Sequence, residues 1–489
     1  MSKDQIRIFL TDDGNIVGGS PLPLGPGEKP PVDKIEDYFQ GYANQGIDAV
    51  SFDFCGGQMS SFPSKVADPH PGEAYQYMDA GIDVGKIMEK TLHDAGVEFW
   101  AGVRMGASLI YRSKFHETHA DWLMTEQHWW GFFRPMLNYE LPEVRAYMMA
   151  IFREVVENYD TDGLLLNFLR YSPLFHPDRD LQCAGLLTDY ISEIRAMLDE
   201  VGEAKGKRLG FAVQVCARPN DGRRHGHNVE DWIKQGSVDY VMPTRANNTD
   251  LGMPVDLWVE MTQGTDCRIL PTVHSRISYP WESHTLQTRD TLRTAAHVFY
   301  GQGAHGISGM NLMCGAQEVI EGWFHWLRDP QACAPLPHHH RYAMKANNSE
   351  EGILRMPILN FNTDDLPPNS GIVQKWYNTL AVRIVDDPAT FESTNVHVTI
   401  ETRQPGARLR VLVNGTPAPT PIGPGHRLGY KYEPMAADDF YFVDYSVPPD
   451  LFVKGVNQIG FQSLDGEDAH GHAPPPGSMT VQEVALMVR

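Results

Sequence analysis

Cysteine is scarce in this 489-residue chain, and its spacing argues against two common kinds of site. The six cysteines stand at positions 55, 183, 216, 267, 314 and 333, and no two of them have a Cys-x-x-Cys spacing. We therefore expect neither a zinc ribbon nor a disulfide framework. Cys55, Cys216 and Cys314 follow predicted strands and could line a site, although small buried side chains are the favoured interpretation.

Long apolar runs and excess positive charge are also missing. No stretch approaches the roughly 18 apolar residues of a membrane-spanning helix. The 41 Lys and Arg residues are outnumbered by 62 Asp and Glu, and the net charge of −21 argues against nucleic acid or anionic membranes as partners. The first residues, Met-Ser-Lys-Asp-Gln, show no secretory leader, which predicts a cytoplasmic location, although a leader already removed would leave the same start.

What the sequence has is one unit repeated eight times: a short apolar run, a loop and an amphipathic helical stretch. The runs are Ile6–Leu10, Ala49–Phe54, Phe99–Met105, Leu164–Leu169, Leu209–Val215, Val238–Met242, Ile269–His274 and Gly306–Leu312. Such runs are typical of strands buried on both faces of a parallel sheet. Helical patterns such as Pro142–Glu157, Leu186–Glu203 and Thr285–Tyr300 alternate with them. This alternation predicts an α/β chain with a (β/α)₈ TIM barrel.

The pattern changes after the barrel region, predicted as residues 1–330. A Pro-rich linker is predicted at 331–371, and short alternating strands with Gly and Pro turns follow. They predict an antiparallel, jelly-roll-like β-sandwich at 372–489. Such an accessory domain could bind sugar, pack on the barrel or make a homo-oligomer.

Barrel proteins place their chemistry on the loops after the strands, which makes polar residues there candidates. Asp53 ends strand 2 before two glycines and is either a catalytic or sugar-binding carboxylate or a paired structural acid. Arg104 ends strand 3 and needs an anionic partner, which Asp53 or a ligand would supply. Asn167 and Arg170 emerge after strand 4 and suit hydroxyls and oxyanions.

Glu282 is the second candidate acid. It follows strand 7 beside Trp281, where apolar contact would raise its pKa, although a helix N-terminal role fits equally. The predicted substrate-binding residues are Arg104, Asn167, Arg170, Gln214, Arg245, His274, Asn311 and Trp281. Asp239 directly precedes the core of strand 6 and is predicted to be structural. The aromatic residues of the loop after strand 3, beginning at Trp122, form either a sugar-binding wall or a small buried cluster.

Two segments resemble a known family. The run that begins Leu137-Asn-Tyr-Glu-Leu-Pro-Glu-Val-Arg, followed by Tyr159-Asp-Thr-Asp-Gly, is similar to the N-x-x-x-P-E-V-R … Y-D-x-D-G segment of the glycosyl hydrolase-like 10 family. The stretch 211–243 resembles the same family, and the resemblance covers most of residues 1–330. It implies a (β/α)₈ fold and a glycoside hydrolase-type activity. One departure is Asn167, where family members often carry an acid.

Glycoside hydrolysis normally uses two carboxyl groups, and Asp53 and Glu282 are the predicted pair. The predicted partner is a carbohydrate, an anionic one if the arginines bind it, and no cofactor or metal is expected. Asn167 keeps open a barrel that binds carbohydrate without hydrolysing it. A metal-dependent hydrolase is the third possibility. However, His225-Gly-His227 and His338–His340 lack the ligand spacing of a known site, and the second group is predicted to be a solvated part of the linker.

Overall fold

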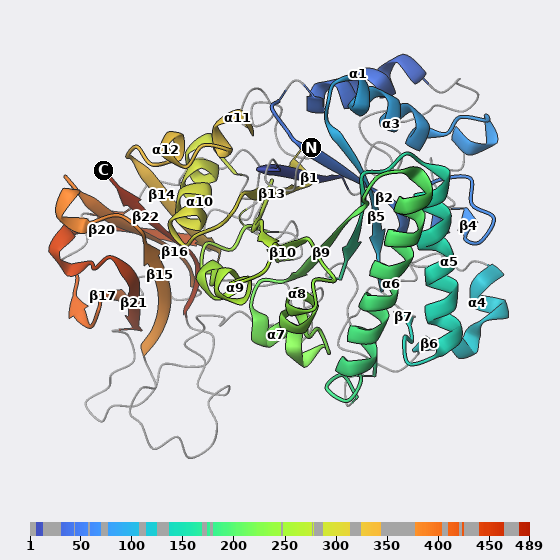
Figure 1. The fold of residues 1–489 in the computed structure, drawn as a ribbon. Helices are drawn as coiled ribbons and strands as arrows, with labels where there is room; N and C mark the ends of the chain where they lie inside the picture. Colours follow the sequence, from blue (N-terminus) through green and yellow to red (C-terminus); the bar gives the residue numbers. More distant parts are fainter. Residues whose placement is uncertain are drawn as a thin grey trace.

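The protein is described by a computed structural model with two parts, a parallel sheet with its helices and a set of antiparallel strands near the C-terminus (Figure 1). The structure describes residues 6–12, 31–43, 45–56, 59–69, 77–106, 114–124, 136–168, 174–176, 179–245, 248–275, 277, 287–312, 324–343, 377–402, 409–419, 423–424, 440–463 and 479–489. None of the helices in these ranges combines the length and apolar character needed to span a membrane.

The parallel sheet contains all eight predicted runs. Its strands are β1 (Ile8–Asp12), β2 (Ala49–Gly56), β5 (Glu98–Arg104), β8 (Gly163–Asn167), β9 (Gly210–Cys216), β10 (Tyr240–Thr244), β11 (Arg268–Ile269), β12 (Thr272–His274) and β13 (Ile307–Met310). They are hydrogen-bonded in the order β11-β10-β9-β8-β5-β2-β1-β13-β12, and short strands β3 (Met59–Ser60) and β4 (Asp68–Pro69) extend β2. The sheet follows the predicted barrel-like order.

The seventh run differs from its prediction. Instead of one strand over Ile269–His274, it forms β11 and β12, separated by Leu270 and Pro271. β11 pairs with β10 and β12 pairs with β13, so the hydrogen-bonded path is open between the two halves of one run. Proline has no N–H to donate to a strand ladder, which explains the interruption at Pro271.

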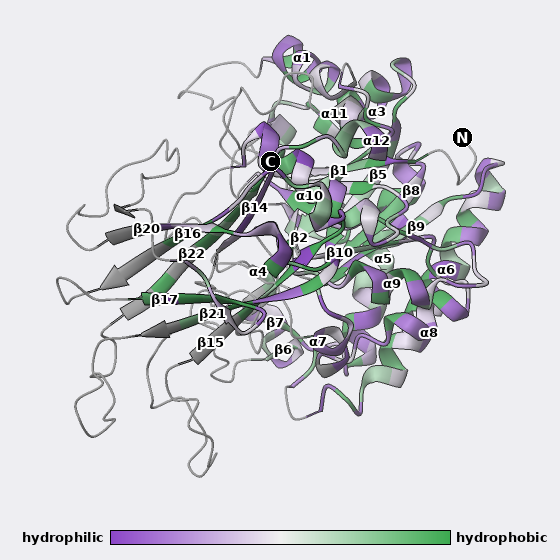
Figure 2. Ribbon diagram, turned by 90° about the vertical axis from the view of Figure 1, so that its left-hand side faces the viewer, coloured by the Kyte–Doolittle hydropathy of each residue, from purple (hydrophilic) through white to green (hydrophobic). Residues whose placement is uncertain are grey.

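Amphipathic helices cover the outside of this sheet. The longer ones are α1 (Val32–Ala43), α3 (Val84–Asp94), α5 (Pro142–Asn158), α6 (Ala184–Lys205) and α10 (Arg289–Gly301). Shorter ones are α4 (Lys114–Thr118), α7 (Pro219–Arg224), α8 (Val229–Lys234), α9 (Val255–Met261), α11 (Phe324–Leu327) and α12 (Pro330–Cys333). Figure 2 shows apolar residues gathered in the strands and mixed polar and apolar residues along the helices. A capping box between Thr288 and Thr291 fixes the start of α10.

The inner face of the sheet is filled near the amino ends of its strands. Its apolar cluster consists of Ile6, Phe9, Ala49, Trp100, Leu165, Ala212, Tyr240, Met242 and Leu270. The Trp100 ring lies edge-on to Phe9 at 5.1 Å and to Tyr240 at 5.7 Å. A Cβ atom at Gly163 or Gly210 would overlap the Trp100 ring, so these glycines make room for the indole. The sheet therefore encloses a packed core at this end.

Three aspartates hold the amino edge of the sheet. Asp48 accepts hydrogen bonds from the N–H groups of Arg7 and Ile8 at 2.8 and 2.9 Å. Asp162 accepts from the N–H of Phe99, and Asp239 accepts from the N–H of Phe211, each at 2.9 Å. Asp239 also receives two hydrogen bonds from Arg208, at 2.9 and 2.8 Å. This edge is the stability face of a barrel, so the contacts agree with the structural role predicted for Asp239.

The C-terminal strands form two antiparallel sheets. One orders β14 (His338–Ala343), β22 (Met479–Val488), β16 (Thr394–Thr402), β20 (Phe440–Val447) and β19 (Gly423–Pro424). The other orders β15 (Tyr377–Ile384), β21 (Gly455–Ser463), β17 (Leu409–Val413) and β18 (Thr416–Pro417). The Tyr445 hydroxyl of β20 donates to the Leu409 carbonyl of β17 at 2.7 Å and links the two sheets.

Strand β14 lies inside the segment predicted as a linker. It pairs with β22 along its length and packs beside α10, where the N–H of His339 donates to Thr294 Oγ1 at 2.9 Å. The first part of the predicted 331–371 linker is therefore helix α12 and a sheet strand. The domain boundaries proposed from the sequence stay predictions.

Candidate functional site

The carboxyl ends of the parallel strands, here called the mouth, bring a row of predicted site residues together. Arg104 of β5 is in register with Asn167 of β8, and Asn167 is in register with Gln214 of β9. Asp53 of β2 pairs with Gly102, two residues before Arg104. Four predicted residues from four neighbouring strands thus lie along one edge of the sheet.

Asp53 and Arg104 form an ion pair at this edge. Arg104 Nε donates to Asp53 Oδ2 at 2.7 Å, and only 3% of the Asp53 side chain and 12% of the Arg104 side chain are exposed. A register shift between Asp53 and Cys55 marks a β-bulge, which turns the strand near its end. A Cβ atom at Gly102 would fall 2.5 Å from Asp53 Oδ1, so glycine is needed for the carboxylate to take this place. Asp53 is the anionic partner that Arg104 needs.

Below this row, the interior of the sheet changes from apolar to polar. Ala49 belongs to the inner apolar cluster, and alternation along β2 places Ser51 and Asp53 on the same face. The Gln214 amide donates to Thr11 Oγ1 at 3.1 Å, joining β9 to β1. Thr272 and Ser308 are in register with each other, and Ser308 is in register with Phe9 of the inner cluster. All these polar side chains are buried.

Several polar atoms of this interior have no hydrogen-bond partner within the described ranges. They are Ser51 Oγ, Gln214 Oε1, Thr272 Oγ1 and Ser308 Oγ. A buried polar atom without a partner costs roughly 1–3 kcal/mol. Such atoms are satisfied by ordered water or by a polar ligand. A buried polar layer therefore lies beneath the mouth.

Two further predicted residues lie at neighbouring strand ends, Arg245 directly after β10 and His274 at the end of β12. The Thr244 hydroxyl is 2.8 Å from His274 Nε2 and donates to the Arg245 carbonyl at 2.7 Å. The His274 N–H donates to Thr249 Oγ1 at 2.9 Å, which fixes the end of β12. His274 and Arg245 are both buried, so the structure holds them in place at the mouth.

Two further contacts define the rim. Asn311 has a positive φ of 50°, a conformation that asparagine tolerates better than most residues, and its N–H donates to the Thr11 carbonyl at 3.1 Å. Arg218 binds Asp250 at 2.8 Å. Although burial raises the pKa of Asp250, the charges of Arg218 and Arg245 outweigh it and lower the pKa below its usual value. Asp250 thus balances two arginines near the mouth.

Some predictions fall outside the described residues. These are Arg170, Trp281 and Glu282, together with most of the aromatic loop after β5 and Cys314. Their roles stay predictions. Trp122, the first aromatic residue of that loop, packs against Phe115 and Tyr147, as in the buried-cluster interpretation. The remaining five cysteines are buried and form no disulfide among the described residues, as expected of small apolar side chains.

The histidines differ from the sequence-based expectation. His225 and His227 are buried, and burial together with the neighbouring His225 lowers the pKa of His227 to about 3. His225 Nδ1 lies 3.9 Å from Asp180 Oδ2. The prediction that His338–His340 are solvated is wrong for His338 and His340, which are buried in β14. Within the ranges that the structure describes, one group of three possible metal ligands is found, and it contains His338 rather than a residue of the mouth.

Sequence reasoning missed the polar layer below the mouth. Thr11, Ser51, Thr272 and Ser308 stand in otherwise apolar strands and were not among the predicted site residues. The signal that could have found them is alternation: Ser51 and Asp53, like Thr272 and His274, are polar residues two positions apart near a strand's end.

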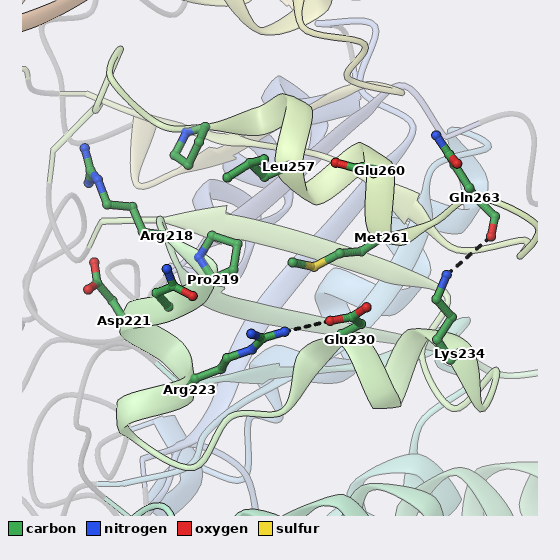
Figure 3. Close-up of a pocket in the computed structure, with 12 residues that line it drawn as sticks. Arg218, Pro219, Asp221, Arg223, Glu230, Lys234, Leu257, Glu260, Met261 and Gln263 are labelled. Atoms are coloured by element: carbon green, nitrogen blue, oxygen red, sulfur yellow. Dashed lines mark hydrogen bonds and ion pairs between the residues drawn. The ribbon is translucent and has the colours of Figure 1, made fainter.

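An open cavity of about 810 Å³ lies outside the sheet, among α7, α8 and α9 (Figure 3). Its walls carry both charge signs, with Arg223 bound to Glu230 at 2.6 Å and Lys234 on the same side. Arg218 and Leu257 also line it. This cavity belongs to the helical layer, and none of the predicted catalytic or substrate-binding residues lines it.

Comparisons with known proteins give likeness in fold alone. No family model matches the chain, and no curated protein matches it by sequence. Among solved structures, the chain is similar to α-L-fucosidase isoenzyme 2 from Paenibacillus thiaminolyticus, with a TM-score of 0.45 and 16% identity over 69% of this chain and 51% of that one. It is also similar to a GH36 α-galactosidase from Geobacillus stearothermophilus, with a TM-score of 0.43 and 12% identity over 99% and 56% of the two chains. The chain thus spans about half the length of these proteins. The resemblance to the glycosyl hydrolase-like 10 family stays a prediction.

Proposed function

We propose that this protein is a glycoside hydrolase that cleaves an oligo- or polysaccharide at the mouth of a (β/α)₈ barrel. The observation that carries the proposal is the buried row formed by Asp53, Arg104, Asn167 and Gln214 above polar atoms that lack partners in the described structure. A carboxylate, a guanidinium and two amides offer complementary donors and acceptors to sugar hydroxyls. The resemblance in the strand 4 and strand 5–6 segments points to the same class.

The proposed roles follow from the charges at the mouth. The guanidinium of Arg104 opposite Asp53 suits an ionised carboxylate, the form that acts as a nucleophile or a general base. Glu282 would be the second carboxyl group and protonate the leaving oxygen. Asn167 and Gln214 would hold hydroxyl groups of the sugar, and His274 and Arg245 would bind its far end.

A second function has one specific observation in its favour. Asn167 occupies the centre of the row. Members of the glycosyl hydrolase-like 10 family, which this chain resembles, often carry an acid at this position. An amide cannot donate a catalytic proton as a carboxylic acid does. A barrel that binds carbohydrate without hydrolysing it is therefore the alternative proposal.

Release of reducing ends from a panel of glycans separates the two functions. The panel should contain neutral and anionic polysaccharides, with binding measured in parallel by calorimetry. We expect turnover of at least one member, and loss of that turnover in Glu282→Gln. Saturable binding without turnover would support the binding protein, whereas neither binding nor turnover would reject both.

A further inference from the structure

A group of three side chains lies between the parallel-sheet part and the C-terminal sheets. His297 is on the face of α10 toward β14, His338 is on β14, and Asp386 follows β15. Figure 1 shows α10 beside β14 at this junction. Three segments more than 40 residues apart in sequence thus meet at one point.

The geometry of this group is close to that of a metal site. His297 Nε2 lies 2.8 Å from Asp386 Oδ1, and His338 Nε2 lies 3.8 Å from Asp386 Oδ2. One possible ligand atom from each residue lies within 4.8 Å of the other two. Ligand bonds of 2.0–2.2 Å around a tetrahedral zinc ion place neighbouring ligand atoms about 3.3–3.5 Å apart. The two contacts, to different oxygens of Asp386, lie on either side of that spacing. His338 Nε2 also lies 3.0 Å from the Ala334 carbonyl oxygen, so binding an ion requires small side-chain movements and release of that contact.

The two imidazoles are held close together beside the carboxylate. His338 is fully buried, and only 12% of the His297 side chain and 23% of the Asp386 side chain are exposed. The rings of His297 and His338 are stacked, with centroids 4.4 Å apart and planes 10° apart. Both rings therefore present their edges to the same carboxylate.

Other histidine–aspartate contacts in the described structure lack this feature. His93 binds Asp162 at 2.8 Å, and His397 binds Asp444 at 2.6 Å. Each of these carboxylates is paired with a single imidazole in the described ranges, and neither pair belongs to a group of three possible metal ligands there. The group of His297, His338 and Asp386 thus differs from these pairs in bringing two imidazoles to one carboxylate.

We propose that His297, His338 and Asp386 bind one divalent first-row transition metal ion, with Zn²⁺ the best match to two imidazoles and a carboxylate. Water would complete the coordination. The ion would fasten β14 and the end of β15 to α10, beside the existing contacts of His339 with Thr294 and of Arg383 with Asp256. Its role is structural, because the three ligands lie on the outer side of α10 and not among the residues of the mouth.

The test is metal binding by the full chain, purified without a histidine tag and treated with a chelator. We expect one Zn²⁺ per chain by calorimetry and metal analysis, a higher melting temperature on Zn²⁺ addition, and the visible absorption of four-coordinate Co²⁺ when Co²⁺ replaces Zn²⁺. Asp386→Asn and His297→Gln change half-buried ligands and should each weaken Zn²⁺ binding by about 100-fold or more, since loss of mere outer-shell partners already costs about 10–100-fold.

The matched control is Asp444→Asn, which removes the carboxylate of the His397 pair in the C-terminal sheets. It should leave Zn²⁺ affinity and the Co²⁺ spectrum unchanged. If the wild-type chain binds no Zn²⁺, the three side chains form a hydrogen-bonded cluster and the proposal fails. The proposal also fails if Zn²⁺ binds with equal affinity to wild type, Asp386→Asn and His297→Gln.

Discussion

The Asp53 carboxylate and the Arg104 guanidinium meet at 2.7 Å across β2 and β5, with both side chains nearly buried. Removing one partner of a buried pair leaves an uncompensated charge, which costs about 3–5 kcal/mol. We therefore expect Arg104→Met to lower the free energy of unfolding by about that amount. The double variant Arg104→Met/Asp53→Asn should lose less free energy of unfolding than the two single variants lose together. Chemical denaturation of all four proteins in a double-mutant cycle measures this difference. Additive losses would show that the two groups are independent.

The Trp100 ring predicts a second stability effect. Gly163→Ala and Gly210→Ala would place a methyl group against the indole, and overpacking of this kind costs about 1–3 kcal/mol. Gly185→Ala, in helix α6, is the control because nothing lies within 4 Å of the added Cβ atom, and alanine favours a helix. Melting temperatures should fall for the first two variants and hold or rise for the control. Equal changes in melting temperature for all three variants would contradict the packing described for Trp100.

The pair of His93 and Asp162 predicts a pH dependence. The hydrogen bond that His93 donates to Asp162 raises the pKa of His93 above its ordinary value, so the stabilisation is complete below that value and is lost as pH rises through the raised pKa. Burial raises the pKa of Asp162, but the hydrogen bonds from His93 and the Phe99 N–H lower it by more. The pKa therefore lies below its ordinary value, and Asp162 stays ionised in mild acid. His93→Gln should therefore cost more unfolding free energy at about pH 5.5 than at about pH 8.5.

His305 provides the contrast for this measurement. Burial lowers the pKa of His305, so its protonation in acid opposes folding. The difference in unfolding free energy between wild type and His305→Gln should therefore grow as pH rises, opposite to the trend for His93. Identical trends for both variants would show that the two histidines titrate alike in the folded protein.

Much of the parallel sheet could be predicted from the sequence because its strands are short, apolar and separated by helices. The run Ala49–Phe54 became β2 and Pro142–Glu157 became α5, each within two residues. The exception is the seventh run, where Pro271 interrupts the ladder. Asp239 was identified as structural because it stands just before its strand, and the contacts with Arg208 and Phe211 agree.

The parts that sequence reasoning missed depend on contacts between distant segments. His338 has no acidic neighbour in the sequence at a ligand spacing, and only folding brings it to Asp386 and His297. The polar layer around Ser51 and Ser308 arises because strands from both ends of the barrel region close on one another. Alternation along a single strand marks Ser51 as facing inward, but it does not show which strand closes against it.

Asn167 at the centre of the row predicts an effect on the reaction rather than on the fold. Loss of one hydrogen bond to a sugar hydroxyl, worth about 1.4–2.8 kcal/mol, lowers kcat/KM by about 10-fold to 100-fold. We expect this loss in Asn167→Ala on the substrate that the glycan panel identifies. The control is Asn457→Ala, which removes a buried asparagine from the C-terminal sheets and should lower stability while leaving kcat/KM unchanged. Wild-type kinetics in Asn167→Ala would exclude Asn167 from sugar binding.

The most direct test of the proposed site compares two aspartates at opposite ends of the same sheet. Asp53 at the mouth and Asp239 at the amino edge are both buried and both bound to arginine within 3 Å. With circular dichroism confirming the folded state, Asp53→Asn should lower kcat on the identified glycan by about 1000-fold or more, as expected for loss of a nucleophile or base. Asp239→Asn should lower the melting temperature but keep kcat within tenfold of wild type. A folded Asp53→Asn variant with wild-type kcat would contradict the catalytic role of the mouth.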